Sequence, residues 1–492
     1  MKIVFVAIHT ENLAVEQLSA YLKSHGHEVE LVFDPQLFKS EAIQNKKLAK
    51  LFDIKQKLVK DILKHKPDVI GFSTFTFNYQ RALELTREIK NHSPNTPIIF
   101  GGVHSTVVPE KVIQEKSVDV VCVGEGEQAL LEYLENTHRT DIQNLWFKKD
   151  TEIIKNSCRP LMDNLDDLPF LDKKLFYNVY PGWQTDYYAI SSRGCPFKCT
   201  YCANHTFHKI YDGLGKVVRR RSPENLIAEL VWAKQNFKLK KITFVDDIFV
   251  QDTEWLRKFI PLYISKINLP YVVLTHPNFV NSEAIKLLKN SSCYLLSMGI
   301  QSANENTRQQ ILKRAGNNQQ ILDVAHWCHQ YKLQFSIDHI FNIPNENTED
   351  YKQALVFYNK IRPSIINTFW LQYFPKTEII KTALQEKYLQ HSDIEKIEQG
   401  LTSTSVVVGL GGKDSFSHNN YSNFQFWMIV LPLLPRKLMN KILKSNQYLK
   451  ISPPLFINAF LKLIINLIRG RGNVYGGILK FYFFFIRKIH AI

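Results

Sequence analysis

The chain has few cysteines, seven among 492 residues, and four of them (Cys122, Cys158, Cys293 and Cys328) are scattered. Such a scatter offers no disulfide framework and is typical of a reducing compartment. The first apolar run is short, and acidic and polar residues follow it without a small-residue cleavage site. We interpret this run as a first strand rather than a signal peptide and expect a cytoplasmic protein.

Acidic residues are absent from the end of the chain. Residues 416–492 contain 11 Lys or Arg and no Asp or Glu, so they carry +11 of the net charge of +16. Their apolar blocks, residues 424–434, 455–468 and 478–486, include no uncharged run of the roughly 18–20 residues that a spanning helix needs. Short aromatic and basic helices favour a membrane surface at its inner face. The alternative is a helical cap packed on the preceding domain.

Length and composition indicate several globular domains. Hydrophobic residues make up 45% and charged residues 22% of the chain, which is ordinary for a folded protein. Residues 141–185 contain Pro160, Pro169 and Pro181 and show no sustained period, so we expect a linker there. We therefore divide the chain into a domain at 1–140, this linker, a second domain at 186–400 and a basic, apolar helical region at 401–492.

The first domain alternates short β-branched runs with helical segments. Such alternation predicts an α/β fold with a doubly wound parallel sheet, similar to a Rossmann fold. The expected strands are residues 2–8, 29–33, 68–73, 97–100 and 118–123.

Two glycine-rich loops follow strands of this domain. Gly101 and Gly102 precede His104 after one strand, and Gly124, Glu125 and Gly126 follow another. Ligands of open parallel sheets bind at the carboxyl ends of strands, and glycine permits positive φ and a close backbone approach to a large planar ligand. Glu125 has a second interpretation, because carboxylates also stabilise the start of a helix.

The second domain begins with a compact cysteine motif. Cys195, Cys199 and Cys202 lie in the run Arg-Gly-Cys-Pro-Phe-Lys-Cys-Thr-Tyr-Cys-Ala-Asn, at residues 193–204. Three thiolates bind a [4Fe–4S] cluster and leave one iron open, whereas an electron-transfer cluster takes four. A zinc site completed by His205 or His208 is the alternative.

This motif, with Tyr201 just before the last cysteine, resembles that of the radical S-adenosylmethionine (SAM) superfamily. The resemblance implies that the amino and carboxylate groups of SAM fill the open iron site. It also implies that an electron from the cluster cleaves SAM to a 5′-deoxyadenosyl radical. Six strand and helix units, the first of which begins just before this motif, match the partial (β/α)₆ TIM-type barrel of that superfamily. Their strands are expected at residues 187–191, 241–245, 271–274, 294–299, 334–340 and 367–373.

Polar residues at the ends of barrel strands extend the resemblance, because such ends carry the function in this architecture. Asp246 and Asp247 stand where many relatives have a Gly-Gly-Glu run that holds the SAM amino group; a helix-capping pair is the alternative. Gln301 and Ser302 are expected near the SAM ribose and methionine. One of the two cations on the next helix, Lys313 or Arg314, is expected to pair with the SAM carboxylate. An Arg fork suits a carboxylate better than a Lys point charge, which favours Arg314.

Residues 1–140 resemble the cobalamin-binding domain that often precedes a radical SAM barrel. The candidate cofactor contacts are Ser73, Gly101, Gly102, His104, Gly124, Glu125 and Gly126. The Asp-x-His-x-x-Gly run that supplies a lower cobalt ligand in many cobalamin proteins is absent, so no such ligand is assigned.

Together these features predict a radical SAM enzyme with a [4Fe–4S] cluster, SAM and cobalamin. We expect methyl transfer to an unactivated carbon of a small hydrophobic, lipid- or isoprenoid-like substrate, with flavodoxin or ferredoxin as the reductant and no nucleic-acid partner. The alternatives are radical cyclisation or oxidation, tRNA or protein methylthiolation, and a non-catalytic iron–sulfur or corrinoid carrier.

Overall fold

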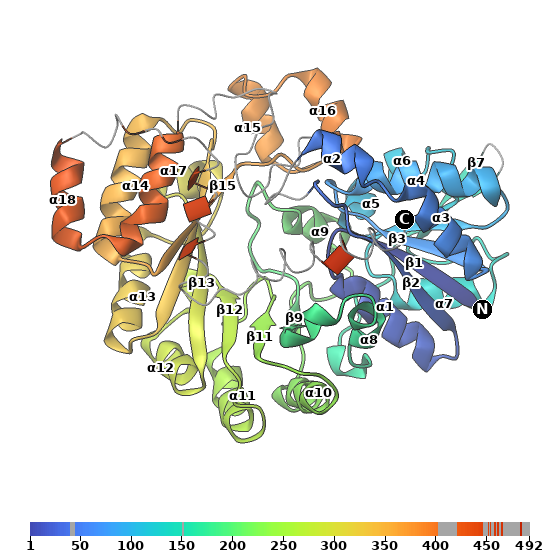
Figure 1. The fold of residues 1–492 in the computed structure, drawn as a ribbon, viewed down its shortest axis with the longest axis horizontal. Coiled ribbons are helices and arrows are strands. Elements are labelled where there is room, and N and C mark those ends of the chain that lie inside the picture. Colours follow the sequence, from blue (N-terminus) through green and yellow to red (C-terminus); the bar gives the residue numbers. More distant parts are fainter. Residues whose placement is uncertain are drawn as a thin grey trace.

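The computed structural model describes residues 1–39, 45–149, 152–401 and 421–445, and isolated residues between 451 and 484. Two α/β units lie side by side, the N-terminal unit in blue and cyan and the central unit in green to orange (Figure 1). The α/β fold class is therefore confirmed. Among the described residues, no helix combines the length and the hydropathy needed to cross a membrane.

The N-terminal sheet has seven strands in the order β2-β1-β3-β4-β5-β6-β7. The first five are parallel to one another, whereas β6 and β7 are antiparallel additions. The strands are β1 (Lys2–Ile8), β2 (Glu28–Asp34), β3 (Val69–Ser73), β4 (Ile98–Gly101), β5 (Val120–Cys122), β6 (Leu145–Lys149) and β7 (Glu152–Lys155). All five predicted strands are present. Two further strands, β6 and β7, extend this sheet past residue 140 into the expected linker.

Helices cover both faces of this sheet, as the alternation along β1 requires. Ile3 and Phe5 point to one face, where they pack with α1 (Leu13–Ser24) and α7 (Glu127–Glu135). Val4 and Val6 point to the other face. There they pack with α3 (Lys55–Lys64), α4 (Tyr79–His92) and α6 (Pro109–Val112). Because alternate side chains enter two separate cores, the strand is apolar from Ile3 to Ile8.

The central unit is a six-stranded parallel sheet in the order β15-β14-β13-β12-β11-β8. Its strands are β8 (Asp186–Ala189), β11 (Lys241–Phe244), β12 (Tyr271–Thr275), β13 (Cys293–Gln301), β14 (Gln334–Phe341) and β15 (Ile365–Trp370). The helices α10 (Pro223–Asn236), α11 (Thr253–Lys266), α12 (Ser282–Asn290), α13 (Asn318–Gln330) and α14 (Thr348–Ile361) connect them. Strands follow one another in chain order with helices between them, as expected for the partial barrel.

The residues between the two units are ordered rather than irregular. Lys173, in α8 (Lys173–Tyr177), is fully buried and lies 2.8 Å from carboxylate oxygens of both Glu11 and Glu16. Its ammonium also lies 4.9 Å from the ring centre of Tyr187 in β8. One buried cation thus joins the first domain, the connection and the first barrel strand.

The tail divides into buried and exposed parts. In α17 (Ser422–Val430), Phe424, Trp427 and Met428 belong to the barrel core, so this apolar block packs as a helical cap and not on a membrane. In α18 (Arg436–Ser445) only Met439 is buried. Most of the expected apolar blocks at 455–468 and 478–486 lies outside the described residues, although Phe484 packs against Phe33.

Candidate functional site

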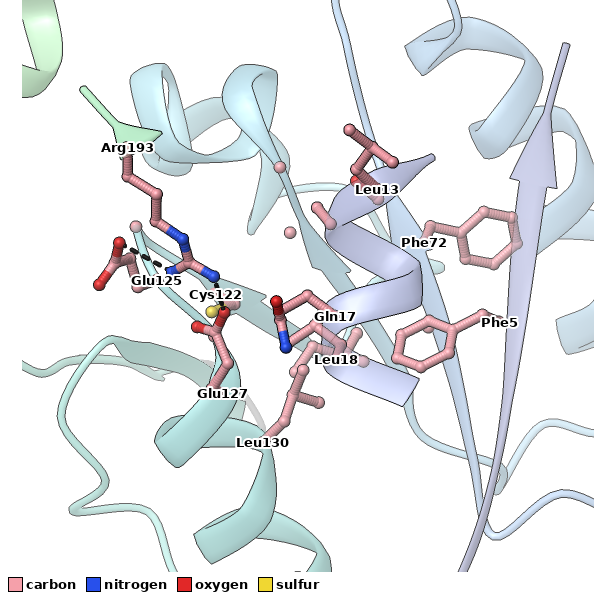
Figure 2. Close-up of a pocket in the computed structure, with 18 of the residues that line it drawn as sticks. Phe5, Leu13, Gln17, Leu18, Phe72, Cys122, Glu125, Glu127, Leu130 and Arg193 are labelled. Atoms are coloured by element: carbon pink, nitrogen blue, oxygen red, sulfur yellow. Dashed lines mark hydrogen bonds and ion pairs between the residues drawn. The ribbon is translucent and has the colours of Figure 1, made fainter. Parts of the chain in front are cut away.

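A cavity of about 250 Å³ lies at the carboxyl edge of the N-terminal sheet. Six of the seven residues predicted to contact cobalamin line it: Ser73, Gly101, Gly102, Gly124, Glu125 and Gly126. Figure 2 shows other lining side chains, including Gln17, Leu18 and Leu130, and the barrel contributes Ile190 and Arg193. The cavity is therefore shared by the two units.

Two glycines in this lining have positive φ, at +88° for Gly102 and +86° for Gly124. A Cβ on Gly102 would lie 2.7 Å from the backbone nitrogen of Thr74. A Cβ on Gly124 would lie 1.7 Å from the hydroxyl of Tyr211, which accepts a hydrogen bond from the Glu125 amide at 2.8 Å. Glycine is required at both positions because neither the conformation nor the space accepts a side chain.

Glu125 is held by the barrel. Its carboxylate accepts hydrogen bonds from Arg193 at 3.0 Å and from Arg219 at 2.7 Å, and Arg193 also pairs with Glu127 at 2.6 Å (Figure 2). Burial acts to raise the pKa of Glu125, but the two arginines lower it overall. Glu125 thus stays charged and ties the cavity to the start of the cysteine loop.

His104 is not among the residues that line the cavity. It is 1% exposed, its ring centre lies 4.2 Å from that of Tyr79, and its Nδ1 is 3.2 Å from the hydroxyl of Thr76. Burial lowers its pKa to about 4. In this conformation His104 is a neutral packing residue behind the glycine loop.

The cysteine loop runs between β9 (Ser192–Arg193) and α9 (Asn204–Ile210). The pKa of Cys195 is raised to about 12, mainly by burial, with smaller contributions in the same direction from the nearby Asp247 and from the thiols of Cys202 and Cys199. The three thiols are therefore close enough to influence one another, as ligands of one centre must be. In the described ranges, no three His, Cys, Asp or Glu side chains are placed so that they could hold a single metal ion. A [4Fe–4S] cluster makes a different demand, because each thiolate binds its own iron atom, and a three-cysteine donor set fits it.

Asp246 holds the strand end that precedes this loop. It is fully buried and accepts hydrogen bonds from the amide of Ser191 at 3.0 Å and from the hydroxyls of Ser191 and Ser192, each at 2.6 Å. Asp247 is exposed and accepts a hydrogen bond from Asn204 at 3.1 Å. Asp246 is saturated by the protein itself, which leaves Asp247 as the more accessible carboxylate of the pair.

Arg314, Tyr201 and Gln301 meet beside the cysteines. The guanidinium of Arg314 lies 3.2 Å from the Tyr201 hydroxyl and 3.7 Å from the sulfur of Cys199. Gln301 has a φ of +73° at a register shift in β13. A Cβ on Gly299 would lie 2.6 Å from Nε2 of Gln301 and 2.9 Å from Nη2 of Arg314. Two of the predicted SAM-site residues, Gln301 and Arg314, are thus brought together with Tyr201 of the cysteine motif, and Gly299 provides the space.

Ser302 donates a hydrogen bond to Glu346, a residue that the sequence did not single out. Glu346 is buried, and burial raises its pKa to about 8. His276 was also missed. It is 2% exposed at the end of β12, and its ring centre lies 4.1 Å from that of Phe197 in the cysteine loop. His276 stands in no linear motif, so only its position after a barrel strand could have indicated it.

Comparison with known protein families assigns both units. The B12 binding domain matches residues 5–134, and the Radical SAM superfamily matches residues 189–357. The predicted resemblance is confirmed. The predicted cofactor set of cobalamin, SAM and a [4Fe–4S] cluster is confirmed at the level of these domains.

The individual relatives share only about a quarter of their residues with this chain. An uncharacterized methyltransferase of Pyrococcus horikoshii is 26% identical, in a match covering 62% of this chain and 66% of the relative. Hopanoid C-3 methylase of Methylococcus capsulatus is 24% identical over 65% of this chain and 59% of its own length. This chain thus spans less than two thirds of either relative. The fold resembles that of the cobalamin-dependent S-adenosylmethionine radical enzyme OxsB, with a TM-score of 0.68, 14% identity and coverage of 100% of this chain and 80% of that one.

Proposed function

Since the chain is a radical SAM protein with a B12 binding domain, we propose that it is an enzyme that transfers a methyl group to an unactivated carbon of a hydrophobic substrate. The bound cofactors would supply the reductive cleavage of SAM and the handling of the methyl group, and the protein would supply orientation and exclusion of water.

One observation carries this proposal: the cavity of the B12 binding domain and the cysteine loop share Arg193. Its guanidinium contacts Glu125 and Glu127 at the cavity, and its backbone stands two positions before Cys195. Both predicted cofactor sites therefore adjoin the same junction. Such proximity is what an enzyme needs if groups on two cofactors are to reach one substrate.

The residues around these sites have separable tasks in the proposal. Cys195, Cys199 and Cys202 would hold the cluster, and Asp246 would fix the strand end that presents them. Gly101, Gly102 and Gly124 would let the corrinoid approach the backbone. Asp247, Gln301 and Ser302 would contact SAM.

The hydrophobic substrate is supported by one of the relatives, which its name describes as a hopanoid methylase. The remaining outcomes of radical chemistry, cyclisation or oxidation, would use the same cluster and SAM site. They differ in product, so a label in the methyl group of SAM separates them from methyl transfer.

The test is to incubate the anaerobically reconstituted enzyme with reductant, methyl-deuterated SAM and a lipid extract. Methyl transfer predicts lipid products that gain the labelled methyl, and these products should disappear in the Cys199→Ala variant. Products that lose hydrogen without gaining the label would instead establish cyclisation or oxidation. A flavodoxin or ferredoxin is the proposed physiological reductant, and it should replace the chemical one.

We further propose that α18 docks on an anionic membrane surface. Arg436, Lys437, Lys441 and Lys444 are all exposed, and Leu438 beside them is 44% exposed. No acidic residue occurs in this helix. Each cation near an anionic leaflet contributes about 1 kcal/mol, so four would give useful affinity.

Co-sedimentation with vesicles tests this docking. The enzyme should bind vesicles that contain phosphatidylglycerol and not vesicles of phosphatidylcholine alone. The double variant Lys437→Glu and Lys441→Glu should abolish binding, whereas the matched change of Lys57→Glu and Lys60→Glu in α3 should not. Equal binding by both double variants would contradict a role for α18.

A further inference from the structure

The guanidinium of Arg314 is committed to the protein. Its Nε donates to the carbonyl oxygen of Gly299 at 3.1 Å, and Nη2 donates to the same oxygen. Its Nη1 donates to the hydroxyl of Tyr201 at 3.2 Å and to the sulfur of Cys199 at 3.7 Å. Arginine has five N–H groups, so these four contacts leave a single N–H.

This arrangement differs from the role expected for Arg314 from the sequence. A bidentate fork on a carboxylate needs two N–H groups that point the same way, and only one is left. The adjacent cation, Lys313, does not take over the SAM carboxylate, because it is exposed and pairs with Glu378. The guanidinium instead faces a cluster ligand.

A permanent positive charge at a cluster thiolate has a defined consequence. Accepting an electron makes an iron–sulfur cluster more negative, and hydrogen bonds to its sulfurs are among the features that set its reduction potential. A guanidinium stays charged at all accessible pH values. It therefore stabilises the reduced cluster more than the oxidised cluster.

We propose that Arg314 is a positioning residue that raises the reduction potential of the cluster through its hydrogen bond to the Cys199 sulfur. An external low-potential donor supplies one electron to the cluster, and Arg314 makes that transfer more favourable. The residue acts before SAM is cleaved and whatever the substrate.

Two neighbours keep the guanidinium in place. The Tyr201 hydroxyl accepts from the same Nη1 that reaches Cys199. Gly299 supplies the carbonyl and leaves the room, since a Cβ there would lie 2.9 Å from Nη2. Tyr201 and Gly299 are thus expected to affect the reduction potential of the cluster by holding Arg314 in position.

The test is a redox titration of the reconstituted full-length protein without SAM, followed by electron paramagnetic resonance. At the potential that half-reduces the wild type, Arg314→Gln should lower the ratio of reduced to oxidised cluster about tenfold, which equals about 59 mV for one electron. The reduction potential of Arg314→Lys should lie between those of the wild type and Arg314→Gln, because lysine keeps the charge but loses the fork. Tyr201→Phe should shift less than Arg314→Gln.

Lys313→Gln is the matched control, because it removes one positive charge from the adjacent, exposed position; it should shift the titration far less than Arg314→Gln. The proposal is wrong if the cluster of Arg314→Gln has the same reduction potential as that of the wild type. If that variant also loses affinity for SAM, Arg314 binds the SAM carboxylate, as the sequence predicted. If Arg314→Gln assembles no cluster, Arg314→Lys decides, and coincidence with the wild-type curve overturns the proposal. Because neither SAM cleavage nor methyl transfer enters the titration, failure of the proposed function would leave this result intact.

Discussion

At the scale of single residues, the start of the cysteine loop is held by the hydrogen bonds of one buried carboxylate. This carboxylate belongs to Asp246, which accepts hydrogen bonds from the amide of Ser191 and from the hydroxyls of Ser191 and Ser192. A buried carboxylate that accepts several hydrogen bonds is held rigidly in position. It therefore serves the cluster loop as an anchor.

Asp246→Asn should loosen this anchor, because an amide offers one acceptor oxygen and turns a donor toward the donors that remain. Hydrogen bonds to charged groups contribute about 1.5–3 kcal/mol each, so we expect a loss of about that size in the free energy of unfolding. Urea denaturation and the iron content after reconstitution measure it. Asp247→Asn, at an exposed position, is the control and should change stability little; an equal loss in both variants would refute the anchoring role.

His104 gives a prediction about pH. Its pKa is lowered to about 4 by burial, although the backbone of Glu398 acts in the opposite direction, whereas an unfolded histidine titrates near 6.5. Between these values the unfolded chain binds a proton that the folded chain does not. Stability must therefore fall as the pH decreases from about 6.5 toward 4.

The variant His104→Gln has no imidazole at this position, so its unfolded chain does not bind the additional proton. Between pH 7.5 and pH 5 the wild type should lose about 2 kcal/mol more stability than the variant, from about 1.4 kcal/mol for each pH unit below 6.5. Urea titrations at both pH values measure the difference, and the other buried histidines contribute equally to both proteins. Parallel losses would show that His104 is protonated in the folded state.

At the scale of elements, the strands were predictable and their additions were not. Runs such as residues 3–8 are apolar throughout because both faces of the sheet are buried, and this signal is strong. The hairpin of β6 and β7 was missed because its residues are half polar at the edge of the sheet, where burial imposes no clear alternation.

The site was predictable where chemistry demands a spacing. The cysteine motif and the glycine loops were recognised, and six of the seven predicted contacts line the cavity. The partners that complete them were not recognised. Tyr211 and Arg219 reach Glu125 from the barrel, across a distance in sequence that no local pattern encodes. The apolar block in α17 was assigned to a membrane because its composition suits lipid and a barrel core equally well.

At the scale of the whole molecule, the junction between the two units depends on charge. Glu125 and Glu127 belong to the first unit, and Arg193 and Arg219 belong to the barrel. Lys173 forms a second, fully buried junction with Glu11 and Glu16. These contacts fix the position of the cavity relative to the cysteine loop.

Glu125→Gln should weaken this junction, because it leaves Arg219 with a reduced set of acceptors in a place where it is almost completely buried. We expect a loss of about 1–3 kcal/mol in stability and poorer retention of corrinoid during gel filtration. Glu283→Gln, which breaks an exposed pair with Arg257, is the matched control. Unchanged corrinoid retention in Glu125→Gln would separate the ion pairs from the cofactor site.

The central claim is that both cofactors act in one enzyme, and the most direct measurement quantifies them together. The protein is purified anaerobically, reconstituted with iron, sulfide and hydroxocobalamin, and assayed for retained corrinoid and for reductant-dependent 5′-deoxyadenosine formed from SAM. If both cofactors act in one enzyme, the protein should retain near-stoichiometric corrinoid and form deoxyadenosine. In Cys199→Ala the deoxyadenosine should be lost while the corrinoid stays. Deoxyadenosine formation without retained corrinoid would contradict it, because the cavity at the glycine loops would then be a scaffold and methyl transfer through cobalamin would be excluded.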